Sequence, residues 1–439
     1  MSSVTLDTAK AMRGISSIPD GWSVLPLKTF LRPRAERDNA DLPLLSVYRD
    51  HGVVPFGSIE GNHNKPSLDL SNYKTVREGD LVLNKMKTWQ GSLAVSDHEG
   101  LVSPAYVVCK VSGDWGRRYL HHLLRSPSFV AEYASLSYGI RVGQWDMRFE
   151  DFREVLALHP PVETQRRIVG YLDSETARID SLIDRKQRFI DLLLEKRTAL
   201  ITHAVTKGLD PDVEMKDSGI EWIGDIPAHW NAVRTKQVAR LESGHTPSRQ
   251  HPEYWENCTV PWITTSEVWQ VRDGRAEYIR ETKEKVSELG LANSSARKLP
   301  AGTVVLSRTA SVGFSAIMPV DMATSQDFAD WVPGPRVTSE YLLYAFRSMR
   351  HEFDRLMMGS THQTIYMPDI QKLSMPLPPL DEQERIVAYV RHMTGLNDAL
   401  VDKTRKSVEL LKEYRTALIS AAVTGQISIP AADSREDVA

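Results

Sequence analysis

The sequence predicts an α+β fold in which two mixed domains alternate with two long helices, and these helices are expected to pair as an antiparallel coiled coil. A segment of 47 residues occurs twice, at 160–206 and 378–424, with 22 identical positions. Both copies place apolar residues at alternating steps of three and four, the pattern of a coiled-coil seam. The segments before the copies, 17–157 and 225–375, also correspond weakly and in order, which indicates a duplicated unit.

Composition limits the class of protein. The chain has 439 residues, a net charge of −3 and two cysteines, Cys109 and Cys258. These values are typical of a globular protein, and a local basic patch can still bind nucleic acid at this net charge. The cysteines lack metal-ligand spacing, which favours reduced thiols. The sequence shows neither a signal pattern nor an apolar run of ~20 residues, so a cytoplasmic location is expected.

The first domain is expected at 1–157. Short β-prone runs predict strands at Leu81–Leu83 and Tyr106–Val108, and a helix is expected near Arg117–Arg125. The first long helix should lie within 158–210, where it would act as a central spacer. It begins after a Pro-Pro pair, because proline disrupts a helix interior but can precede a helix. Gly208 stands where a left-handed terminating residue is expected, as does Gly425 after the second long helix.

The second half repeats this order. A domain at 211–375 should contain strands at Val260–Ile263 and Val304–Leu306 and helical structure over Ser339–Met357. The second long helix follows within 376–428, and the acidic residues 429–439 are expected to form a flexible tail. The corresponding positions of the two domains include Gly79 with Gly302, Gly91 with Gly313, and Tyr119 with Tyr341.

The predicted seam runs through both long helices. About 43 helical residues at 1.5 Å each would make a rod of roughly 60 Å. Polar residues interrupt the seam, which should specify register at some cost in stability; they are Glu175, Lys186, Asn397 and Thr404. The apolar positions are Ile168, Leu172, Ile179, Leu182, Phe189, Leu193 and Leu200 in the first copy and Ile386, Val390, Met393, Leu400, Leu411 and Leu418 in the second. The alternative is that these are core helices of a bundle.

Motifs of catalysis and metal binding are missing from the sequence. We find no Walker A loop, no dinucleotide-binding glycine motif, no H-E-x-x-H and no C-x-x-C pair. The chain is therefore not expected to be an enzyme, and no catalytic or metal-binding residue is assigned.

Polar loops in both domains are instead suited to DNA. Arg and Lys bind guanine edges and phosphates, and Gln can pair with adenine. The first domain offers Lys85, Lys87 and Trp89 in a basic-aromatic loop, together with Arg141 and Gln144. The second domain offers Arg249, Arg308, Thr309, His362 and Gln363. By their chemistry, Arg141, Gln144, Arg308 and Gln363 are the candidates for reading bases, whereas Lys85, Lys87 and Arg249 are expected to contact phosphates. Each loop taken singly could also be an ordinary surface loop.

These features resemble the specificity subunits of Type I restriction–modification systems. The motif Pro-Pro-x-x-x-Gln-x-x-Ile at 160–168 and 378–386 carries the resemblance, as does the segment 217–230 between the halves. Residues 246–255, followed by Pro261-Trp262, look like one class of target recognition domain. Residues 45–49, with Gly79-Asp80 and 84–86, look like another. His245 departs from the family, which often has a second glycine there.

The resemblance implies a non-catalytic subunit that recognises a bipartite, asymmetric DNA target. It would hold two adenine-methyltransferase (modification) subunits, which restriction (endonuclease and translocase) subunits join. S-adenosylmethionine, ATP and Mg²⁺ would belong to those partners and not to this chain. Two alternatives remain: a specificity protein that serves methylation alone, and a repeat scaffold that binds protein and not DNA. Salt-dependent binding to duplex DNA would separate the scaffold from the others.

Overall fold

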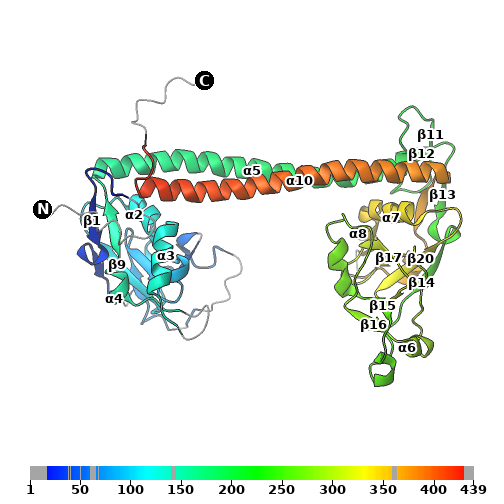
Figure 1. The fold of residues 1–439 in the computed structure, drawn as a ribbon, viewed down its shortest axis with the longest axis horizontal. Coiled ribbons are helices and arrows are strands. Elements are labelled where there is room, and N and C mark those ends of the chain that lie inside the picture. The colour runs from blue at the N-terminus through cyan, green and yellow to red at the C-terminus, as the bar shows by residue number, and fades with distance from the viewer. Residues whose placement is uncertain are drawn as a thin grey trace. The chain divides into compact units, whose positions relative to one another are not determined.

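A computed structural model describes residues 17–37, 39, 41–49, 51–59, 66–67, 69–139, 145–357 and 363–429. The chain divides into two compact units, formed by 1–185 with 407–439 and by 186–406. The long helices α5 (Val162–Lys207) and α10 (Leu380–Val423) contribute one part to each unit. In each unit a mixed domain packs against one end of α5 and the opposite end of α10 (Figure 1). The α+β class and the paired helices confirm the prediction.

The domain of the first unit is built around a four-stranded sheet with the order β2-β9-β6-β7. Strand residues alternate between its two faces. Leu81 and Leu83 face α2 and α3, whereas Val82 joins a second core with β3, β4, β5 and β8. The elements are β1 Ser23–Pro26, η1 Leu27–Thr29, β2 Leu31–Pro33, β3 Leu45–Tyr48, β4 Gly52–Pro55, β5 Lys74–Val76, β6 Leu81–Asn84, η2 Thr88–Gln90, β7 Leu93–Val95, β8 Gly100–Val102, β9 Tyr106–Val111, α2 Arg117–Leu124, α3 Pro127–Leu136, α4 Phe149–Phe152 and β10 Leu156–His159.

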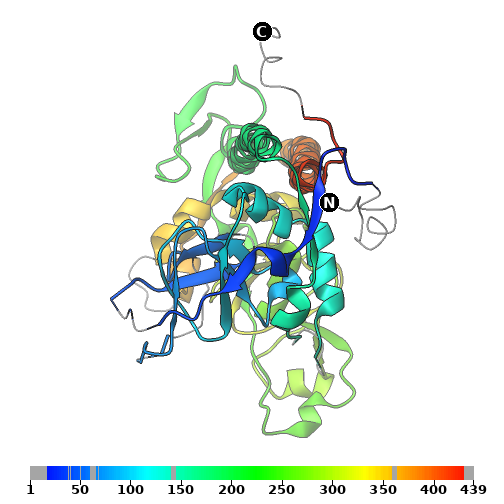
Figure 2. The same ribbon diagram turned by 90° about the vertical axis from the view of Figure 1, so that its left-hand side faces the viewer.

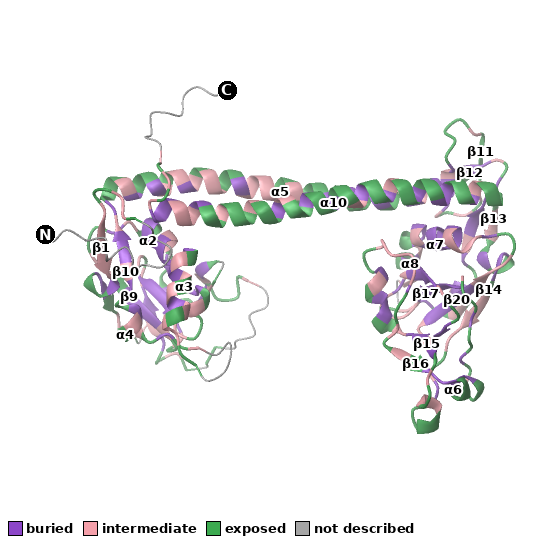
Figure 3. Cartoon of the chain, in the orientation of Figure 1, coloured by how far each residue is buried: buried purple, intermediate pink, exposed green. Residues whose placement is uncertain are grey.

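The domain of the second unit has an equivalent four-stranded sheet, β14-β20-β17-β18. Val304 and Leu306 face α7, whereas Val305 faces the opposite core, as in the first domain. The elements are β11 Met215–Asp217, β12 Asp225–Pro227, β13 Asn231–Arg234, η3 Thr235–Gln237, β14 Ala239–Ser243, η4 Pro252–Trp255, β15 Val260–Ile263, η5 Thr265–Val271, β16 Glu284–Val286, α6 Glu288–Ala292, β17 Val304–Ser307, β18 Ser315–Ile317, β19 Ala323–Thr324, β20 Phe328–Pro333, α7 Ser339–Ser348, α8 Arg350–Met357, α9 Met367–Ile370 and β21 Ser374–Leu377. The inner strands of both sheets are largely buried, whereas α5 and α10 expose one side (Figure 3).

The helices pair antiparallel within each unit. In the second unit, Arg197 Nε lies 3.1 Å from Asp398 Oδ1, and Asn397 Nδ2 donates to the Leu193 carbonyl at 3.0 Å. In the first unit, the repeat-equivalent pair joins Arg415 Nε to Asp180 Oδ1 at 2.8 Å. At that end the two helices lie side by side (Figure 2). Each repeat therefore supplies the Arg to one pair and the Asp to the other, which explains why both residues recur.

The predicted seam is wrong by one residue at two places. Phe189 and Leu400 are exposed, at 43% and 41% of their surface, and the neighbouring Ile190 and Val401 are buried in their stead. The buried positions of α10 keep steps of four and three from Val390 to Val408 by including polar residues, such as Thr394 and Asn397. At both places two apolar residues are adjacent in the sequence, and the prediction chose the one that is exposed. Asn397 and Thr404 are buried in the seam, as expected.

The repeated glutamine fixes each helix to the domain before it. Gln383 donates to the carbonyls of Pro378 and Arg336, both at 2.9 Å, and accepts from the Thr338 amide at 3.0 Å. Gln165 makes the equivalent three bonds in the first unit, to the backbone of Pro160, Asp114 and Gly116. A buried amide with all three bonds made determines the angle at which the helix leaves its domain.

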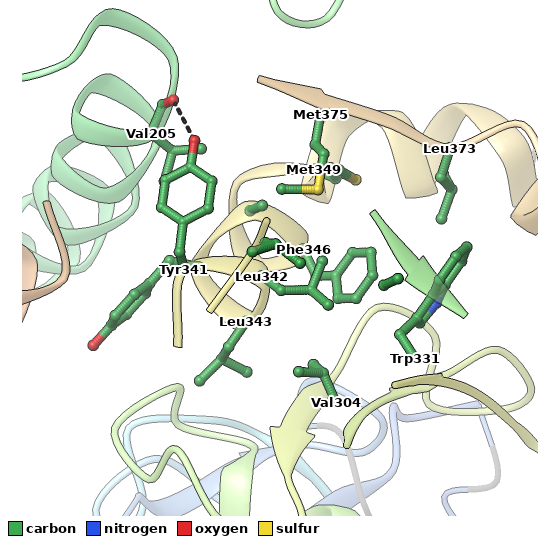
Figure 4. Packing of buried hydrophobic residues seen from close by; sticks show 14 of the residues in the cluster. Val205, Val304, Trp331, Tyr341, Leu342, Leu343, Phe346, Met349, Leu373 and Met375 are labelled. Atoms are coloured by element: carbon green, nitrogen blue, oxygen red, sulfur yellow. Dashed lines mark hydrogen bonds between the residues drawn. The ribbon is translucent and has the colours of Figure 1, made fainter. Parts of the chain in front are cut away.

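A tyrosine of each domain binds the end of the other long helix of its unit. Tyr341 Oη donates to the Val205 carbonyl at 3.3 Å, as Figure 4 shows, and it also lies 3.1 Å from the Pro376 carbonyl. Tyr119 Oη lies 3.0 Å from the Val423 carbonyl, and the predicted equivalence of the two tyrosines is confirmed. The glycines expected to terminate the helices, Gly208 and Gly425, have φ of 76° and 71°.

Candidate nucleic-acid interface

Four loops of the second domain meet at one edge of its four-stranded sheet. Ser243 pairs with Ala329 and Ser307 pairs with Phe328, so β14 and β17 both end where β20 begins. The loops after β14, after β17 and before β20 therefore share this edge. We call the loops at 244–249, 308–311, 325–327 and 363–364 the second loop cluster.

Backbone contacts hold the second loop cluster together. His245 N donates to the Thr324 carbonyl at 3.1 Å, and Arg308 N donates to the Asp327 carbonyl at 2.8 Å. Gly244 lies so close to Thr324 that an added Cβ would be 2.1 Å from its Oγ1. Thr246 Oγ1 donates to Gln326 Oε1 at 2.7 Å. His245, where the family often has a second glycine, is thus accommodated at an exposed position of the loop.

Three of the predicted residues come together in this cluster. Ile365 N donates to the Arg308 carbonyl and Ala310 N to the Gln363 carbonyl, both at 2.9 Å, and Thr309 forms a bridge with Thr364. Ala310 has φ of 61°, a left-handed conformation that is uncommon for a residue with a side chain. Arg308 and Gln363, which are 55 positions apart in sequence, thus lie on one surface, and Gln363 is exposed there.

Arg308 and Arg249 differ in what surrounds their charge. Arg308 Nε is buried and has no hydrogen-bond partner within the described part of the chain. Arg249 instead pairs with Glu284 at 2.5 Å, and its guanidinium carbon lies 3.7 Å from the centre of the Trp255 ring. The charge of Arg249 therefore already has a partner on β16 and an aromatic support. Arg308 Nε has no such partner among the described residues.

The first domain forms the same arrangement with other residues. Asn84 pairs with Tyr106, so the loop after β6 lies at the edge where β9 begins. Met147 N donates to the Lys85 carbonyl at 3.0 Å, as Ile365 N does to that of Arg308. Lys85 is half-buried and Lys87 is exposed. We call the loop at 84–92 together with 145–148 the first loop cluster.

Aromatic rings support the first loop cluster. Trp89 and Trp145 have ring centres 5.0 Å apart, and Trp89 Nε1 donates to the Met86 carbonyl at 3.1 Å. Trp89 is half-buried, and its contacts with Trp145 and Met86 hold the loop in shape. Met86, in the same loop, is exposed at 59%, and Tyr138 is exposed at 58%.

Sequence reasoning missed Lys74 and Arg37. Lys74 Nζ donates to the carbonyls of Pro104 and Tyr106, at 3.1 and 2.6 Å, at the same sheet edge. Burial lowers the pKa of the Lys74 ammonium, and the nearby charges of Lys85 and Arg37 lower it further. Three basic groups thus gather beside the first loop cluster. No local motif marks Lys74, because its position follows from the pairing of β5 with β8.

The predictions for Arg141, Gln144 and His362 lie outside the described residues. Within the described ranges, no group of three or more His, Cys, Asp or Glu side chains is placed to hold a metal ion. None of the described helices has the length and apolarity needed to cross a membrane.

Arg308→Ala is expected to relax the base preference in one part of the DNA target and to cost ~1–3 kcal/mol of binding free energy. Lys85→Ala should instead weaken binding to all DNA sequences alike, and it should lower the slope of log binding constant against log salt concentration by about one unit. The two residues occupy equivalent positions, yet only arginine can form a bidentate fork. Competition binding of the assembled methyltransferase to matched and mismatched duplexes, at several salt concentrations, measures both effects. Equal loss on both duplexes for Arg308→Ala would assign that residue to the DNA backbone.

Comparison with known proteins supports one family. Residues 227–410 match the model of the Type I restriction modification DNA specificity domain. The MjaVIII specificity subunit of Methanocaldococcus jannaschii is 23% identical over 96% of both chains. The MjaIX specificity subunit of the same organism is 28% identical over 209 residues, which are 47% of this chain and 46% of that relative.

Solved structures share the fold over nearly the whole chain. A chain from a study of complex assembly and conformational transition of the type I R-M system has a TM-score of 0.68 at 19% identity, over 94% of this chain and all of that one. The HsdS subunit of Thermoanaerobacter tengcongensis has a TM-score of 0.56 at 19% identity, over 95% of this chain and all of its own. The relatives are specificity subunits, in agreement with the prediction of a non-catalytic chain. Residues 227–410 thus match the DNA specificity domain of this family, and the chain is similar over nearly its whole length to specificity subunits of Type I restriction–modification systems.

Proposed function

We propose that the chain recognises a bipartite, asymmetric DNA target, with one half-site for each loop cluster. The observation that supports this most directly is the equivalence of Lys85 and Arg308. Each follows a central strand of its sheet, β6 or β17, and the carbonyl of each accepts a hydrogen bond from a backbone amide in the segment before a short helix, α4 or α9. The two domains share the same backbone arrangement but present different side chains, so we expect them to recognise two different short DNA sequences.

The long helices are proposed to scaffold two adenine-methyltransferase subunits. Their reciprocal pairs, Arg197 with Asp398 and Arg415 with Asp180, give each unit an equivalent helical surface. Leu192 and Leu410 occupy the same repeat position and are exposed at 61% and 55%. Two copies of one partner could therefore each contact an equivalent exposed leucine, since exposed apolar groups often mark protein interfaces.

The remaining chemistry is assigned to the partners. We propose that S-adenosylmethionine, ATP and Mg²⁺ are bound by the methyltransferase and restriction subunits in the cytoplasm. A methyltransferase must extrude the adenine, since its N6 is not reachable within the stacked duplex. This chain would then determine which adenines are presented.

Mapping methylated adenines in a genome that carries this gene and its methyltransferase tests the proposal. We expect two short, different half-sites with centres about 10 bp apart, one turn of the DNA helix, because both clusters would then address one face of the duplex. A strain with an otherwise identical system and this gene deleted is the control. A palindrome, or one continuous motif, would contradict the asymmetric bipartite reading.

A further inference from the structure

Asp330 is a carboxylic acid in the interior of the second recognition domain. It lies in the middle of β20 and is fully buried. Its Oδ2 accepts a hydrogen bond from Thr324 Oγ1 at 2.5 Å, and its Oδ1 is buried without a partner among the described residues. A carboxylate with one oxygen unsatisfied and no cation beside it is costly to bury, so this geometry favours the uncharged acid.

The groups that face Asp330 do not offset a negative charge. Val305 lies opposite on β17, and Glu242 lies opposite on β14. Glu242 is itself acidic, and it is already paired with Arg240 at 2.7 Å and Arg297 at 3.4 Å. From β19 the facing group is Thr324, which is neutral. Burial raises the pKa of Asp330 to about 7, with the hydrogen bond from Thr324 opposing the shift and Glu242 adding to it.

The first domain has no such acid at the equivalent place. Val108 stands opposite Val82 just as Asp330 stands opposite Val305, and Val102 precedes Val108 by the same six residues that separate Thr324 from Asp330. Both valines are buried in an apolar core. The fold therefore forms without a polar pair here, and the pair in the second domain calls for a role specific to that domain.

Thr324 connects Asp330 to the second loop cluster. Its carbonyl accepts from His245 N at 3.1 Å, and its side chain forms the wall against which Gly244 packs. The next residue, Ser325, begins the loop that binds Thr246 through Gln326. A change in the protonation of the Asp330 carboxyl can therefore affect the loops at 244–249 and 325–327, because both contact or follow Thr324.

We propose that protonated Asp330 is a positioning residue for the second half-site: it holds Thr324, and through it the loops at 244–246 and 325–327, in the arrangement that binds DNA. Ionisation places an unpaired negative charge beneath the loops and favours an opened sheet edge that admits water. Recognition of the second half-site then falls as pH rises through the neutral range, while recognition of the first does not. This inference rests on the proposed function.

The linkage has a definite sign. In the folded state the pKa of Asp330 lies above the ordinary value of 3.8. Its contribution to the stability of the fold is therefore fully present below about pH 4 and is lost as pH rises toward 7. In that window the contribution of Asp330 to the unfolding equilibrium constant grows about tenfold per pH unit. Asp330→Asn, which keeps the shape and cannot ionise, removes this slope.

The test measures discrimination by the full chain assembled with its methyltransferase subunits between pH 5.5 and 8.5. The competitors are a matched duplex and duplexes altered in one half-site. We expect second half-site discrimination to fall toward tenfold per pH unit above about pH 7, and to stay flat in Asp330→Asn. First half-site discrimination is the internal control and should stay flat in both. A paired Thr324→Val and Asp330→Val variant, which copies the first domain, should also be flat.

Thermal unfolding of the same proteins over the same pH range gives a readout that needs no DNA. The transition of the unaltered chain should fall more steeply with rising pH than that of Asp330→Asn. Equal pH profiles for the two proteins, or equal sensitivity of both half-sites, would overturn the inference while leaving the proposed function intact. A lack of discrimination at either half-site at every pH would overturn both.

Discussion

Exchange of residues 225–375 for the matching domain of a relative is expected to change one half-site completely and to leave the other unaltered. Each mismatched base pair costs about 1–3 kcal/mol, so a half-site of several base pairs changes affinity by orders of magnitude. The physical reason is that each loop cluster is held by its own sheet and by strands of its own unit. The methylome of a strain carrying the chimera shows the outcome directly.

The structure shows which contacts the chimera has to keep. The incoming domain needs a tyrosine at position 341 for the Val205 carbonyl, and its backbone at 336 and 338 has to meet Gln383. A chimera with Tyr341→Phe in the incoming domain is the matched control for faulty docking, since it leaves buried carbonyls unsatisfied. If a folded chimera altered both half-sites, the two clusters would not be independent readers.

Asp398→Ala is expected to destabilise the second unit by roughly 3–5 kcal/mol, the usual cost of removing one partner of a buried ion pair. The side chains of Arg197 and Asp398 are only 11% and 15% exposed, so the arginine would keep its charge with little access to water. Its remaining bond, from Nη2 to the Gly274 carbonyl at 2.8 Å, does not neutralise that charge. Denaturant unfolding followed by circular dichroism measures the difference.

The chain supplies its own control for this prediction. Asp180→Ala removes the repeat-equivalent carboxylate in the first unit, where Arg415 and Asp180 are 38% and 49% exposed. Water screens that pair, so a loss of only about 0–1 kcal/mol is expected. A double replacement, Arg197→Met with Asp398→Leu, should recover most of the stability, because an apolar pair avoids the cost of burying charge. Equal losses for the two single variants would show that burial does not set the strength of these pairs.

The candidate site was only partly predictable from sequence. The strand before Arg308 and the turn after it could be read locally, since Val304–Leu306 is β-prone and Gly313 follows. The meeting of Arg308 with Gln363 could not, because it depends on backbone bonds between loops 55 residues apart. Lys74 was missed for the same reason, and the partner of Arg249 on β16 gave no local signal.

Sequence alone was enough to establish the duplicated architecture, the two long helices and their glycine ends. These follow from repetition, from a period of three and four, and from motifs that are local in the chain. The tertiary structure decided the seam register at Ile190 and Val401, the reciprocal ion pairs, and the membership of each loop cluster. It also decided that Asp330 is an interior acid and not a surface one. The physical reason is that burial and partner choice are set by which elements pack together, and neighbouring residues in the chain carry no record of that packing.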